Sequence, residues 1–123
     1  MPITLTIDSE KRIVYSALHG IIHEAEFLAQ PQRIQNHPAF DPSFSEIIDL
    51  RGITDVQVPP ESIRQLAATE SIFNRESKHV VIAPSGLIMD FARMFQLDAQ
   101  QTRPHVVIVK TPAEAYEYLR EKS

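Results

Sequence analysis

The chain has 123 residues, a formal net charge of -4 and no cysteine. This length suits one domain, residues 1–123, with a real core, and the lack of cysteine excludes disulfides, thiolate catalysis and cysteine-ligated metals. The acidic balance without a basic cluster argues against nucleic-acid binding, and no stretch approaches the roughly 20 apolar residues of a membrane helix. We therefore expect a cytoplasmic domain without membrane insertion.

Two strands are predicted to open the fold. Apolar and polar residues alternate over residues 3–8, and a second apolar stretch covers residues 13–18, which together predict an antiparallel hairpin that ends at Gly20. A helix is expected over residues 23–36. Pro31 is predicted to kink or divide this helix near Gln30, because an interior proline removes a backbone hydrogen bond and clashes with the preceding turn.

Three further strands and three helices alternate through the rest of the chain. The patterns predict strands over residues 46–50, 79–83 and 106–109, and an extended stretch over residues 53–58. Helices are expected to begin at Pro60, after Ser85 and at Pro112, and the first of them is expected to present Ile63, Leu66, Ala67 and Phe73 on one face. The order β-β-α-β-α-β-α-β-α predicts an α/β fold with a five-stranded mixed, mainly parallel sheet and an N-terminal antiparallel hairpin.

The stretch SEIIDLRGIT, residues 45–54, places charged residues at the expected carboxyl end of the third strand, where Gly52 would allow a sharp turn. Ligands gather at such ends in open α/β sheets. The candidate residues are Asp49, Arg51, Thr54 and Asp55. They form either a binding or catalytic edge, with Asp49 or Asp55 as a base, or an ion pair that holds the loop locally.

Two other places offer candidate contacts. Ser85 and Gly86 begin a helix whose free amides suit an anion, although Ser85 also suits a plain N-cap. In the same helix, Asp90, Arg93 and Met94 flank the apolar stripe. Asp90 and Arg93 suit a solvated pair, and Met94 could form with Leu87 an exposed apolar strip for a partner. The five histidines are not expected to converge on a metal.

The IIDLRGIT stretch (residues 47–54), the APSG turn (residues 83–86) and the ARMF segment (residues 92–95) together resemble bacterial STAS/Sec14-like domains. These belong to the superfamily of anti-sigma-factor antagonists, and the order of elements matches over essentially the whole chain. The resemblance implies a regulatory module that binds a partner kinase and is switched by phosphorylation of a serine. Here the corresponding region, residues 58–62, lacks the family's Asp and Gly, and two prolines replace its flexible turn residues. Ser62 is expected in the first helical turn beside Glu61, whose charge would oppose a phosphate, so Ser62 is not expected to act as that switch.

Three functions are compatible with these residues. The first is a non-catalytic regulatory or protein-interaction domain with no cofactor, and the two apolar faces of the central strands also predict a homodimer. The second, implied by the Sec14-like half of the resemblance, is a binding protein for a lipid or another small apolar or anionic ligand. The third is an enzyme that uses Asp49 or Asp55 as a base.

Overall fold

A computed structural model describes residues 2–122 of the chain, and the side chains of residues 2–120. Five strands form one sheet in the order β1-β2-β3-β4-β5, with β1 antiparallel to β2 and all other neighbours parallel. The predicted α/β class and order of elements are therefore confirmed. The elements are β1 (Ile3–Asp8), β2 (Ile13–His23), α1 (Glu24–Gln35), β3 (Ser45–Gln57), α2 (Pro60–Ala68), β4 (His79–Ile82), α3 (Gly86–Asp98), β5 (Val106–Val109) and α4 (Pro112–Lys122).

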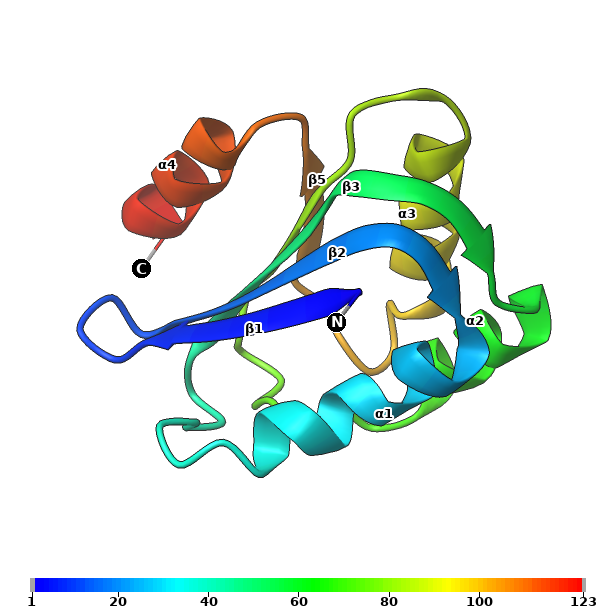
Figure 1. Ribbon diagram of the computed structural model, residues 1–123. Coiled ribbons are helices and arrows are strands. Elements are labelled where there is room, and N and C mark those ends of the chain that lie inside the picture. The colour runs from blue at the N-terminus through cyan, green and yellow to red at the C-terminus, as the bar shows by residue number, and fades with distance from the viewer. Residues whose placement is uncertain (1, 123) are drawn as a thin grey trace.

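The helices divide unequally between the two faces of the sheet (Figure 1). Helices α1, α2 and α3 lie on one face, and α4 lies on the other. On the α4 side, Ile47 and Val80 pack against Ala115 and Leu119 of α4. The second apolar face of the central strands is thus covered within one chain, and the homodimer stays a prediction.

Strands β2 and β3 continue well past the end of β4, which corrects two predictions. Gly20 does not end β2, and Gly52 does not turn the chain. Gly20 instead has φ +66°, and the pairing with β3 shifts register on both sides of it, so the strand bulges and goes on. Beyond Asp49, which pairs with the last residue of β4, the two strands form a ribbon that curls over the helix-covered face (Figure 1).

Gly52 is required by a close approach between β2 and β3. A Cβ atom at this position would lie 2.8 Å from His19 Nδ1 and 2.9 Å from the carbonyl oxygen of Leu18. Both distances are shorter than a carbon atom tolerates, so a side chain would force the two strands apart. Gly52 was predicted to let the chain turn. In the structure it instead lets β2 and β3 pack closely.

Helix α1 runs through Pro31 without a break, so the predicted division near Gln30 is wrong. Contacts to the sheet hold the helix on both sides of the proline. Gln30 Nε2 donates to Ser16 Oγ at 3.0 Å, and Arg33 Nη1 donates to the carbonyl oxygen of Ile3 at 3.1 Å. Tertiary contacts of this kind offset the hydrogen bond that proline removes from the helix.

Helix α2 ends at Ala68, so Phe73 does not lie on its face as predicted. Phe73 is nevertheless buried, because the loop after α2 returns it to the core. Its ring meets Phe40 edge-on at 5.2 Å and His79 edge-on at 5.1 Å between centroids. The apolar spacing identified a core residue correctly but assigned it to the wrong element.

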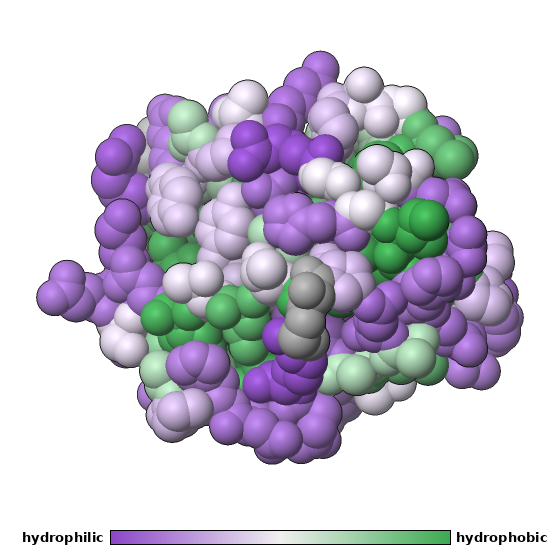
Figure 2. All heavy atoms as spheres, viewed as in Figure 1, coloured by the Kyte–Doolittle hydropathy of each residue, from purple (hydrophilic) through white to green (hydrophobic). Residues whose placement is uncertain are grey.

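The face that carries β1 is mainly hydrophilic, and its apolar residues show in separate patches (Figure 2).

Among residues 2–122, no helix combines the length and the apolar character needed to span a bilayer.

Candidate functional site

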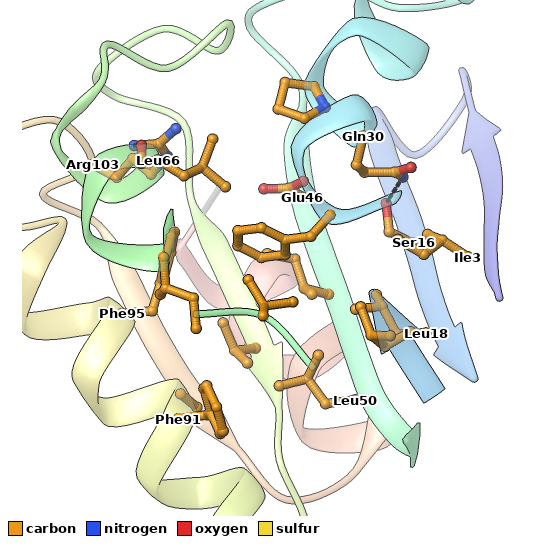
Figure 3. A pocket seen from close by; sticks show the side chains of 18 of the residues that line it. Ile3, Ser16, Leu18, Gln30, Glu46, Leu50, Leu66, Phe91, Phe95 and Arg103 are labelled. Carbon is orange, nitrogen blue, oxygen red and sulfur yellow. Dashed lines mark hydrogen bonds between the residues drawn. The ribbon is translucent and has the colours of Figure 1, made fainter. Parts of the chain in front are cut away.

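A cavity of about 290 Å³ lies between the sheet and helices α1, α2 and α3 (Figure 3). This volume is close to the lower end of the roughly 300–1,000 Å³ that is usual for small-molecule sites. Most of the side chains around it are apolar. Its wall includes Leu18, Phe27, Ile48, Leu50, Phe91 and Phe95.

Neighbouring residues of β3 show that the core is unfilled on this side. Ile47 points toward α4 and is 0% exposed. Ile48, the next residue, points toward the three helices and is only partly buried, as is Leu50. Protein interiors are close-packed, so partial exposure of central-strand side chains beneath three helices marks space that the chain itself does not fill.

The curled ribbon of β2 and β3 closes one end of the cavity. Ile22, Ile53 and Val56 belong to this ribbon, and Val58 follows it directly. All four side chains line the cavity. The bulge at Gly20 that lets the ribbon continue is therefore also what brings these apolar residues to the site.

The opposite end of the cavity carries a partly buried carboxylate. Glu46 extends from the start of β3, and its carboxylate points into the cavity (Figure 3). Its Oε1 lies 2.7 Å from Nδ1 of His79, the register partner of Glu46 on β4. The Glu46 side chain is 12% exposed and that of His79 is 2% exposed. Glu46 thus lies at the amino ends of the parallel strands, away from the carboxyl ends where sequence reasoning sought the site.

Arg103 joins the cavity wall from the loop before β5. Its Nη1 donates to the carbonyl oxygens of Ala67 at 3.2 Å and Thr69 at 3.0 Å, at the end of α2, and its guanidinium lies 5.7 Å from the ring centroid of Phe95. Burial lowers the pKa of Arg103, and the charge of Glu46 acts in the opposite direction. Arg103 therefore fastens α2 to α3 and leaves a cation near the carboxylate end of the cavity.

Asp49 and Arg51 form the ion pair that was one of the two predicted outcomes. Arg51 Nε donates to Asp49 Oδ1 at 3.0 Å, Arg51 Nη2 to Oδ2 at 2.8 Å, and the hydroxyl of Tyr15 to Oδ2 at 2.6 Å. Burial raises the pKa of Asp49, but the hydrogen bonds from Arg51 and Tyr15 outweigh it and hold that pKa below its ordinary value. A carboxylate held in this way is a poor general base, and the arrangement favours a clasp.

This clasp lies on the α4 side of the sheet, because Tyr15 packs with the core cluster there and stacks on Tyr116 of α4. Asp49 and Arg51 are also within β3 rather than at its end. Thr54 and Asp55 are exposed farther along the same strand, and across residues 2–120 no hydrogen bond or ion pair joins either to Asp49 or Arg51. The four predicted residues therefore do not form one site.

The serines singled out from the sequence are placed outside the cavity. Ser85 occupies the N-cap position of α3 and Gly86 follows it with φ +63°, but the Ser85 side chain makes no capping hydrogen bond. Both residues are exposed. Ser62, in the first turn of α2, donates to a carboxylate oxygen of Glu24 and so ties α2 to α1.

Leu87 and Met94 do not form the exposed apolar strip that was predicted on α3. Leu87 is 72% exposed, whereas Met94 packs into the cluster around the cavity. Asp90 and Arg93 are exposed, and no ion pair joins them in the part of the chain whose side chains are described. Met94 is thus a core neighbour of the site, while Leu87 faces solvent.

Sequence reasoning missed Glu46, His79 and Arg103. A signal for Glu46 was present, since it shares strand parity with Ile48 and Leu50 and must point to the same face. Arg103 had no such signal, because its position depends on where the loop between α3 and β5 passes.

The described residues contain no group of three or more His, Cys, Asp or Glu that could hold a metal ion. No protein-family model matches the chain, and no curated protein is significantly similar to it in sequence. The resemblance to STAS/Sec14-like domains therefore stays a prediction.

Proposed function

We propose that the protein binds a small apolar molecule in the cavity beneath α1, α2 and α3. The observation that carries this proposal is the unfilled apolar space over the central strand, where Ile48 and Leu50 remain partly exposed. This is the second of the functions that the sequence allowed. We favour it over protein interaction because the cavity offers space for a ligand.

The size of the cavity limits the affinity for a purely apolar ligand. At the roughly 30 Å³ that a water molecule occupies in the liquid, 290 Å³ holds about ten small groups. Burying a CH₂ group contributes about 0.8 kcal/mol, so such a chain gains roughly 8 kcal/mol before about 4 kcal/mol or more is lost to restricted motion. The net gain of roughly 4 kcal/mol or less corresponds to a Kd on the order of 1 mM or weaker.

Methyl NMR titration with octane and 1-octanol tests the proposal. We expect the methyl signals of Ile48, Leu50 and Ile53 to shift, and those of Ile47 and Ile82 on the α4 side to stay in place. Ile48→Phe fills the cavity and should remove the shifts. Leu87→Phe adds a similar volume at an exposed position and should leave them unchanged. Absence of shifts at the cavity methyl groups with both probes would overturn the proposal.

Two exposed leucines on α3 favour a second candidate function, protein interaction. Leu87 is 72% exposed and Leu97 is 67% exposed. They stand near the two ends of α3, so a partner that covers both would contact this helix along its length. Self-association is the simplest form of this function, and it matches the predicted homodimer. Equilibrium sedimentation of the wild type and of Leu87→Glu/Leu97→Glu tests it, and a wild-type monomer at tens of micromolar would remove it.

A further inference from the structure

Glu46 presents a hydrogen-bond acceptor to the cavity that the described part of the protein leaves without a donor. One carboxylate oxygen, Oε1, is paired with His79 Nδ1 at 2.7 Å. The other oxygen, Oε2, accepts no hydrogen bond from any residue in the range 2–120. Among the described residues no side-chain N or O atom is both buried and without a partner, so Oε2 still reaches solvent. A ligand that displaces water from this oxygen must replace the lost hydrogen bond with a donor of its own.

The charge of this carboxylate is already partly balanced. Arg103 lines the same cavity and interacts electrostatically with Glu46, although no ion pair joins their side chains in the part described. A cationic ligand would therefore add a positive charge, beside that of Arg103, that nothing compensates. An anionic ligand would be repelled by Glu46. A neutral donor supplies the missing hydrogen bond at the smallest desolvation cost.

The rest of the cavity fixes the shape of such a ligand. From Glu46 the wall follows β3 through Ile48 and Leu50 to Ile53, where the curled ribbon closes it. Figure 3 shows Glu46 between α1 and α2, with Leu18 and Leu50 farther along the strands. The site therefore has one polar end and one apolar end.

We propose that the ligand is an apolar alcohol: its hydroxyl donates to Glu46 Oε2 and its hydrocarbon body lies along β3. This inference rests on the proposed function, because it assigns the chemistry of the ligand in the same cavity. A chain of about eight to ten carbon atoms fits the volume.

Four probes of equal chain length test the head group: octane, 1-octanol, octylamine and octanoate. Affinity is measured by methyl NMR at pH 7 with the whole protein. We expect 1-octanol to bind at least tenfold more tightly than octane and than octanoate, since a hydrogen bond to a charged group outweighs its desolvation by about this factor. Octylamine should bind more weakly than 1-octanol.

Glu46→Gln tests whether Glu46 makes the distinction. The glutamine carbonyl can still accept from His79, so the wall is kept, but the negative charge is lost. We expect the affinity for 1-octanol to fall and that for octanoate to rise, so that their ratio shrinks at least threefold, while octane is unaffected. Glu76→Gln removes an exposed charge away from the cavity and should change none of the four affinities.

The outcomes separate the two proposals. If none of the probes binds, the proposed function itself fails. If octane binds as tightly as 1-octanol, the cavity binds apolar molecules and the alcohol inference is overturned. Octylamine or octanoate as the tightest probe would also overturn it. The comparison of the four probes on the wild type decides the matter even if Glu46→Gln does not fold.

Discussion

At the residue scale, the Asp49 carboxylate shows how one buried charge is accommodated. It is 6% exposed, and Arg51 and Tyr15 donate to it. Removing one partner of a buried carboxylate costs more than the pair contributes, because the remaining charge keeps its desolvation penalty. The hydroxyl of Tyr15 is therefore a local determinant of stability rather than of binding.

Tyr15→Phe should lower the free energy of unfolding by about 1 kcal/mol at pH 7, a value reduced for partial exposure of the hydrogen bond. Burial, together with the hydrogen bond to Asp49, raises the pKa of Tyr15 from 10.0 to about 12. The folded state therefore holds this proton more tightly than the unfolded state. The stabilisation is fully present below pH 10 and is lost as pH rises toward 12.

Urea unfolding of the wild type and of Tyr15→Phe at pH 7, 10 and 11.5 measures this difference. We expect it to shrink steadily over the two alkaline steps. Tyr118→Phe, in the same core cluster, is the control and should show no such trend. A wild-type advantage that stays constant up to pH 11.5 would contradict the role assigned to the Tyr15 hydroxyl.

At the element scale, the sequence predicted all nine helices and strands but misjudged three residues that usually break them. Hydrophobic period identified the elements that bury one face, and short continuous apolar runs identified β4 and β5, which have apolar residues on both faces. Gly20, Gly52 and Pro31 were expected to interrupt the chain, yet strand pairing and helix–sheet contacts carry it through all three. Local propensity cannot report such tertiary contacts.

The candidate site was harder to predict than the fold for a related reason. Asp49 and Arg51 attracted interest as a charged pair at an apolar strand, and the structure pairs them with each other. The cavity instead depends on how far three helices stand from the sheet, which no single segment encodes. Of the cavity residues that were missed, only Glu46 could have been predicted from the sequence to face the same side as Ile48 and Leu50, because side chains alternate along a strand.

Gly52→Ala should test the packing between β2 and β3. We expect it to lower the free energy of unfolding by about 1–3 kcal/mol, the usual cost of overpacking, since the new methyl group would meet both His19 and the Leu18 carbonyl. Urea unfolding measures the loss. Adding His19→Ala should recover only part of it, because the backbone carbonyl remains. A neutral Gly52→Ala would contradict the close approach.

At the scale of the whole molecule, the cavity couples binding to stability. A close-packed domain of this size would fill the space over its central strand, and the unfilled volume costs stability in the free protein. A ligand that binds only the folded state returns that stability, by about 1.4 kcal/mol at a free concentration tenfold above its Kd. For a domain of this length this corresponds to a rise in Tm of roughly 5 °C.

Ile48→Phe should stabilise the free protein and abolish the stabilisation by a ligand. The larger ring occupies apolar space that is otherwise empty, so we expect the free protein to gain about 1 kcal/mol, while the rise in Tm with 1-octanol disappears. Calorimetry with and without 1-octanol measures both, and Leu87→Phe on the exposed face of α3 should alter neither. Destabilisation of the free protein by Ile48→Phe, together with an undiminished response to 1-octanol, would show that the space over β3 is neither empty nor the binding site.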